Sequence, residues 1–167
     1  MRNFGLGVLV AVVFSAGVAY SAQKPSNDQV LREARDRAEI EDLMWRYTRA
    51  LDTGDGEAYA AAYTPDGQFG TGANATKGRD ALRKLATGQP RTATTPARPP
   101  MYHMHANHMI TFTDKDHARF DAYYLTARAG GGQDQPLQVL AVGRSVDDLV
   151  RLNGRWLIQT RNVQPTN

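Results

Sequence analysis

Apolar residues between positions 28 and 55 recur at intervals of three and four. The residues at these positions are Ile40, Leu43, Met44, Tyr47 and Leu51. This spacing is that of one face of an α-helix, and Ser26 or Asn27 can cap its start. We therefore predict an amphipathic helix that ends near Thr53 and Gly54.

Three shorter patterns follow this helix. The segment GEAYAAAYTPDG, residues 56–67, predicts a second helix that Pro65 and Gly67 end. Its apolar face would contain Ala58, Ala61, Ala62 and Tyr63. GQFGTG then predicts a brief strand, and GRDALRKLA, residues 78–86, a third helix.

The chain changes character after a Pro-rich and Thr-rich segment, residues 87–100, which we interpret as a surface loop. From Met101 onward, long apolar and alternating runs are separated by TDKDH, AGGGQDQP and an Asn153–Gly154 turn, as in antiparallel strands. Three helices followed by such strands indicate an α+β domain. We predict a cone-shaped, strongly curved antiparallel sheet that three N-terminal helices close around a pocket.

The first 22 residues, MRNFGLGVLVAVVFSAGVAYSA, have a basic start, an apolar run and small residues before a plausible cleavage site. This order is typical of a secretory signal peptide, although a membrane anchor is the alternative. We expect cleavage and a periplasmic or secreted protein. Residues 23–37 would form a polar lead and the start of the first helix, and residues 38–165 a single domain.

Charge and cysteine content exclude several classes of function. The formal net charge is only +3, and the 20 basic residues are interspersed with 17 acidic ones. We therefore expect no nucleic-acid partner, and no membrane partner after signal cleavage. The chain has no cysteine, which excludes disulfides and a thiol nucleophile.

Three of the four histidines lie in MYHMHANHMI, residues 101–110. On a regular strand His103, His105 and Asn107 would share one face, and His108 would point the other way. Such a face can be a metal site, an acid–base site or a set of polar side chains satisfied in a core. A zinc site usually needs a third strong ligand, so we predict no metal.

Several segments together resemble the SnoaL-like branch of the nuclear transport factor 2 superfamily. They are LDTGDGEAYAAAYTPDGQF, the helix starting GRDAL, the histidine strand ending in Asn107, and the closing NGRWLIQTR. The resemblance covers residues 38–163. The branch includes polyketide cyclases, scytalone dehydratase, a hexachlorocyclohexane dehydrochlorinase and members without known activity, and it implies a pocket for a small molecule.

The resemblance assigns roles to four residues. It implies that Asp52, just after the first long helix, orients His103, which acts as a general base. Arg161, five residues after the tryptophan of the last strand, would stabilise negative charge or clamp a substrate carboxylate. Tyr47 stands where the dehydrochlorinase has a lysine, so a phenol replaces a cation. Leu51 and Arg128 stand where scytalone dehydratase has a tyrosine and a second histidine.

We expect five further side chains to bind substrate, namely Trp45, Phe69, His105, Asn107 and Tyr123. The predicted ligand is a small hydrophobic or carbonyl-containing molecule, and no cofactor is expected. Three functions remain open: a cofactor-independent lyase or isomerase, a ligand-binding protein without chemistry, and an interaction module. A homodimer formed through the sheet is expected and is compatible with all three.

Overall fold

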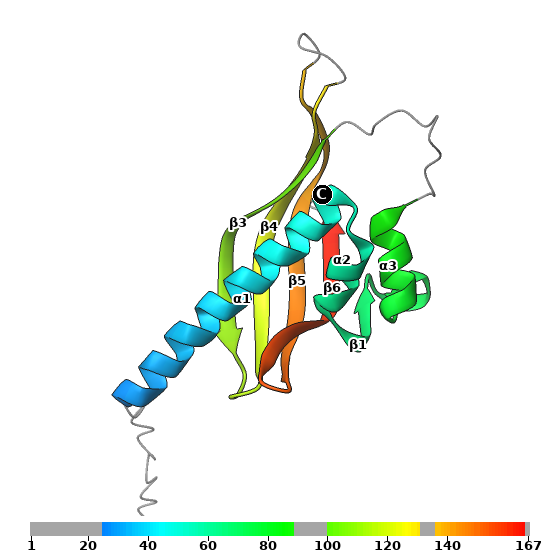
Figure 1. The fold of residues 1–167 in the computed structure, drawn as a ribbon. Helices are drawn as coiled ribbons and strands as arrows, with labels where there is room; N and C mark the ends of the chain where they lie inside the picture. The colour runs from blue at the N-terminus through cyan, green and yellow to red at the C-terminus, as the bar shows by residue number, and fades with distance from the viewer. Residues whose placement is uncertain (1–24, 89–99, 131–135, 166–167) are drawn as a thin grey trace, which may run out of the picture.

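The structure is a computed structural model that describes residues 25–88, 100–130 and 136–165 (Figure 1). Its helices are α1 (Asn27–Thr53), α2 (Gly56–Ala61), a 3-10 turn (Gly72–Asn74) and α3 (Arg79–Thr87). Its strands are β1 (Tyr63–Phe69), β2 (Thr76–Lys77), β3 (Met101–Phe112), β4 (His117–Arg128), β5 (Gln138–Leu152) and β6 (Arg155–Pro165). The predicted signal peptide and most of the predicted loop at 87–100 lie outside the described residues.

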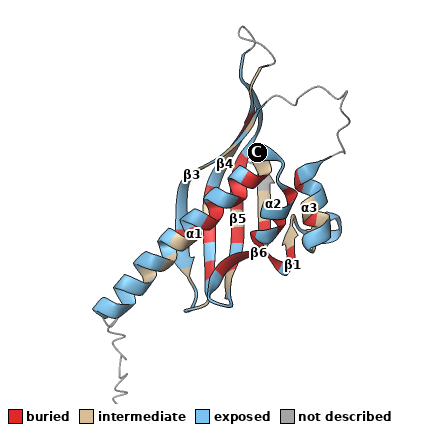
Figure 2. Ribbon diagram, in the orientation of Figure 1, coloured by how far each residue is buried: buried red, intermediate tan, exposed pale blue. Residues whose placement is uncertain are grey.

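Helix α1 begins and ends as the sequence predicts. The Ser26 hydroxyl accepts a hydrogen bond from the Gln29 amide at 3.2 Å, and Gly54 adopts a left-handed φ of 72° that ends the helix. The predicted apolar face is buried against the sheet, except that Leu51 is only partly buried. In Figure 2 the buried residues of α1 lie where it crosses the sheet, and the N-terminal turns are exposed.

The predicted α+β class is confirmed, with six strands in the order β2-β1-β6-β5-β4-β3. Every pair is antiparallel except β1–β6, which is parallel. The sheet is therefore mixed rather than wholly antiparallel. Helix α1 lies across one face of it, and α2 and α3 lie at the β1 side (Figure 1). No helix among the described residues is long and apolar enough to cross a membrane.

The predicted second helix is too long. It ends at Ala61, and residues 63–69 form strand β1, because the Ala62 carbonyl accepts a hydrogen bond from the Ile158 amide at 2.9 Å. Pairing with β6 outweighs local helix propensity here. Gly67 lies where the register with β6 shifts, and a Cβ at this position would lie only 2.9 Å from the Cβ of Tyr63.

Strand β3 contains a bulge that the sequence pattern did not reveal. Ala106 pairs with Tyr123 and Met109 with Asp121, so Asn107 and His108 together oppose one residue of β4. Asn107 adopts a left-handed φ of 48°. The bulge shifts the alternation by one residue, which places His108 on the helix-facing side and Asn107 on the opposite side. The prediction that Asn107 shares a face with His103 and His105 is therefore wrong.

Candidate functional site

A cavity of about 180 Å³ lies between the C-terminal part of α1 and the helix-facing side of the sheet. Its lining residues are Tyr47, Leu51, Phe69, His103, His105, Tyr124, Thr126, Ala141, Arg161 and Val163. A larger groove of about 770 Å³ lies along the N-terminal half of α1 and is lined mostly by charged residues. That groove contains no predicted site residue, so the chemistry is concentrated in the smaller cavity.

Asp52 and His103 form a pair at the wall of this cavity. Oδ1 of Asp52, in the last turn of α1, lies 2.7 Å from Nδ1 of His103 and accepts the backbone N–H of the same residue at 3.0 Å. The Asp52 side chain is 8% exposed and that of His103 20%. The carboxylate favours a proton on Nδ1 and leaves Nε2 without a hydrogen-bond partner among the described residues. This arrangement is suited to general-base chemistry.

Arg161, on β6, is buried at the opposite side of the cavity. One guanidinium nitrogen is ion-paired with Asp147, and Nη2 donates to Nε2 of His105 at 2.7 Å. The guanidinium carbon also lies 4.6 Å from the centre of the Tyr47 ring. Arg161 is only 3% exposed, so it is part of a buried network rather than a flexible surface cation.

His105 is held neutral within this network. Burial lowers its pKa to about 3, and the positive charge of Arg161 acts in the same direction. Because a guanidinium can only donate, Nε2 of His105 is the acceptor and the ring proton is on Nδ1. His105 therefore holds Arg161 in place, and it does not act as a charged general acid.

Asp147 is the residue that sequence reasoning missed. It lies on β5, is fully buried, and one carboxylate oxygen has no hydrogen-bond partner among the described residues. Burial raises its pKa to about 7, and Arg161 opposes this effect. Ser145, Asp147 and Leu149 alternate on one face of β5 and are all buried, and the strand pairing, not the local sequence, shows this.

Tyr47, which lies under the guanidinium, packs against two further tyrosines. Tyr47 lies 5.1 Å from the ring of Tyr59 and 6.1 Å from that of Tyr63, and the hydroxyls of Tyr59 and Tyr63 are 3.1 Å apart. Burial raises the pKa of Tyr59 and of Tyr63 well above the ordinary value. All three are almost fully buried, so their packing fixes Tyr47 at the cavity.

Two of the five predicted substrate-binding residues, Phe69 and His105, line the cavity. Asn107 and Tyr123 instead line a shallow depression on the other side of the sheet. The bulge in β3 turns Asn107 to that side, and strand alternation in β4 places Tyr123 there. Tyr124 faces the cavity in place of Tyr123.

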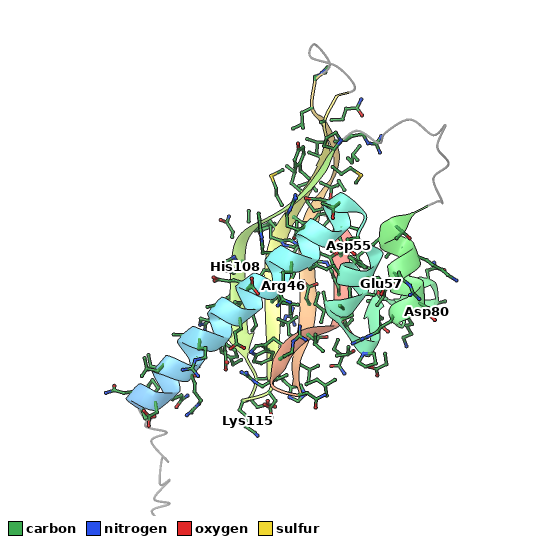
Figure 3. The ribbon with its side chains drawn as sticks, viewed as in Figure 1. Arg46, Asp55, Glu57, Asp80, His108 and Lys115 are labelled. Atoms are coloured by element: carbon green, nitrogen blue, oxygen red, sulfur yellow. The ribbon has the colours of Figure 1, made fainter. Side chains whose placement is uncertain are left out.

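Trp45 is 65% exposed and lies in a neighbouring cleft of about 270 Å³ between α1 and β3, which His103 and His105 also line. His108, which is labelled in Figure 3, borders the same cleft. It is bonded to Glu41 at 3.1 Å and stacked on Phe120 at 5.2 Å. Within the described ranges, no three His, Asp or Glu side chains are arranged to hold a metal ion.

Comparison with known proteins identifies the family. Residues 32–162 match the SnoaL-like domain. No curated protein matches the chain. Among solved structures, Rv3472 from Mycobacterium tuberculosis, a protein of unknown function, is 25% identical with a TM-score of 0.71, over 83% of this chain and 76% of its own.

Two other solved structures have the same fold. An NTF2-like protein with a cystatin-like fold from Novosphingobium aromaticivorans is 24% identical with a TM-score of 0.71, over 87% of this chain and 93% of its own. A Catenulispora acidiphila protein in complex with S-DNPA is 27% identical with a TM-score of 0.63, over 79% of this chain and 94% of its own. The matched domain spans most of the chain, and the protein belongs to the SnoaL-like family.

Proposed function

We propose that the protein is a cofactor-independent lyase or isomerase that binds a small molecule in the 180 Å³ cavity. The observation that carries the proposal is the Asp52–His103 pair at the cavity wall, with Nδ1 held by the carboxylate at 2.7 Å. The complex of the Catenulispora acidiphila relative with S-DNPA supports small-molecule binding at this fold.

The proposed reaction begins with transfer of a proton from a substrate carbon to Nε2 of His103. The electron pair of the broken C–H bond forms a carbon–carbon double bond, with negative charge on an adjacent carbonyl oxygen or with departure of a leaving group from the next carbon. Asp52 stabilises the imidazolium that forms. Arg161 and Tyr47 line the same cavity, and their polar groups stabilise the developing negative charge.

Deuterium exchange tests proton abstraction without knowledge of the natural substrate. We would incubate single-ring ketones, namely cyclohexanone, cyclohex-2-enone and acetophenone, with the protein in D2O and follow α-deuteration by mass spectrometry. The wild type should accelerate exchange of at least one ketone over buffer. His103→Gln should lower that rate by a factor of about 100 or more, which is typical for loss of a general base.

The chain offers a matched control for this substitution. His117 is also paired with an aspartate, Asp114, at 3.0 Å, but both lie at an exposed turn away from the cavity. His117→Gln should leave exchange unchanged. Equal rates in wild type and His103→Gln would contradict the proposal, and a ketone that raises the melting temperature without exchange would support a binding protein instead.

A second function, assembly through the outer face of the sheet, is supported by an apolar row on that face. Met104 pairs with Leu125, which pairs with Val142, and two of these three side chains are about half exposed. We propose that this row forms a homodimer interface. Val142→Glu should convert a dimer into a monomer in light scattering, whereas Leu31→Glu, at an exposed apolar position of α1, should not.

We also propose that the protein is exported and is periplasmic or secreted after loss of residues 1–22. The basic start, apolar run and small residues of this segment support the proposal. Mass spectrometry of the protein isolated from its native host tests it. A mature chain that begins near residue 23 is expected, and a full-length chain would contradict cleavage.

A further inference from the structure

The positive charge of Arg161 is already compensated inside the protein. Arg161 and Asp147 are 3% and 0% exposed and form a direct ion pair, so neither charge is screened by solvent. A second guanidinium nitrogen is bonded to His105. Arg161 therefore faces the cavity as one half of a neutral pair and not as an open cation.

The other groups around the cavity add no net positive charge. His105 is neutral, and Asp52 is negative beside His103. Among the described lining residues, Arg161 and a protonated His103 are the two possible cations, and each has its own carboxylate. A carboxylate entering this cavity would add a third negative charge beside these two pairs and would have to share Arg161 with Asp147.

Electrostatics then disfavours an anionic ligand in the ground state. Like charges a few ångströms apart repel strongly where solvent is excluded. A neutral substrate avoids that repulsion, and it acquires negative charge only when its proton moves to His103. The imidazolium that forms on His103 then compensates the developing negative charge, a compensation that is absent when an anion binds in the ground state.

The size of the cavity limits the substrate further. A cavity of about 150 Å³ lined by Leu, Ile and Phe side chains can hold benzene, and this one measures about 180 Å³. Its apolar walls come from Leu51, Phe69, Ala141 and Val163. This volume fits one six-membered ring or a chain of similar size.

We propose that the site selects an uncharged, single-ring substrate, and that Asp147 determines this selectivity because it occupies the guanidinium of Arg161. The inference rests on the proposed function for the identity of the site. It differs from the expectation that Arg161 clamps a substrate carboxylate.

Benzamide and benzoate test the proposal, because they have nearly the same shape and differ in charge. Binding is measured by calorimetry at about pH 8.5, above the pKa of Asp147 of about 7. Wild type should bind benzamide more tightly than benzoate by at least about tenfold, about 1.4 kcal/mol. In Asp147→Asn, benzoate should gain at least about tenfold in affinity while benzamide changes little.

Asp121→Asn is the matched control. Asp121 is also ion-paired, with Arg119 and Arg144, but it lies on the outer face of the neighbouring strand β4, so this change should leave both affinities as in wild type. If Asp147→Asn does not fold, the double variant Asp147→Asn with Arg161→Gln removes both charges. That variant should retain the preference for benzamide.

Three results would overturn the proposal: equal binding of both ligands by wild type, an unchanged preference in folded Asp147→Asn, or no binding of either ligand at millimolar concentration. Failure of this inference is distinguishable from failure of the proposed function. His103→Gln should lose deuterium exchange yet keep the preference for benzamide. Conversely, if wild type showed no preference for benzamide, His103→Gln could still lower the exchange rate, and the proposed function would stand.

Discussion

Nη2 of Arg161 donates a hydrogen bond to Nε2 of His105 at 2.7 Å, which joins the last strand to the histidine strand across the cavity. The bond requires a neutral His105 with its proton on Nδ1, since the guanidinium has no acceptor. Arg161 is held from its other side by Asp147. The position of the guanidinium thus depends on two residues that need not contact substrate.

His105 should not titrate in the physiological range. Burial and Arg161 lower its pKa to about 3, so its ring carbon and nitrogen chemical shifts should stay constant from pH 8 to 5. Nitrogen NMR of the imidazoles should show the Nδ1–H tautomer for this residue. The exposed His117 provides the comparison, and a His105 midpoint near 6.5 would contradict the buried hydrogen bond.

The same shift predicts a pH dependence of stability. Between about pH 6.5 and 3, unfolded His105 binds a proton that the folded residue does not, so the free energy of unfolding falls as pH falls. Asp147 acts in the opposite direction, because its raised pKa makes the folded state bind the extra proton as pH falls below about 7. The contribution of His105 must therefore be isolated by substitution.

His105→Asn isolates it, because asparagine can still accept from Arg161 but does not titrate. As pH falls from 7 to 5, the wild type should lose the His105 contribution to its free energy of unfolding, at most about 2 kcal/mol, and the variant should not. Urea denaturation at the two pH values measures the difference. The same change in wild type and variant would show that His105 protonates freely in the folded state.

The Asp52–His103 contact was reached through family resemblance, since the two residues are 51 positions apart and no local pattern joins them. Helix α1 could be predicted from periodicity alone, because its apolar face, cap and terminating glycine are local signals. The placement of Asn107 and His108 could not, because a bulge changes strand alternation without changing composition.

Asp147 was missed for a different reason. In the segment SVDDLV it stands beside Asp148, which is exposed, and only the pairing register of β5 shows which of the two faces the core. The partner that makes its burial tolerable, Arg161, is 14 residues away on the next strand. A buried ion pair of this kind becomes visible only when the sheet is assembled.

Removal of one partner of that ion pair should cost more than removal of both. Asp147→Ala leaves a buried uncompensated guanidinium and should lower the free energy of unfolding by about 3–5 kcal/mol. Asp147→Ala combined with Arg161→Met should recover much of this loss. Denaturation of the two single variants and the double variant measures the coupling, and additive losses would show that the two side chains do not interact.

The bulge at Asn107 gives the last prediction. Its left-handed φ of 48° is tolerated by asparagine and glycine but is strained for β-branched residues. Asn107→Gly should therefore change stability little, whereas Asn107→Val should destabilise the fold by about 1–3 kcal/mol. Thr111→Val, at an exposed position of the same strand, is the control for an exposed valine on β3.

Because the bulge sets the phase of β3, Asn107→Val should also act on the site. If β3 became a regular strand to relieve the strain, His108 would turn to the outer face and lose its bond to Glu41. The positions of His103 and His105 relative to α1 would also be disturbed. Ketone exchange should then fall together with stability in Asn107→Val but stay normal in Asn107→Gly. Full activity in a stable Asn107→Val protein would show that the left-handed conformation is not required.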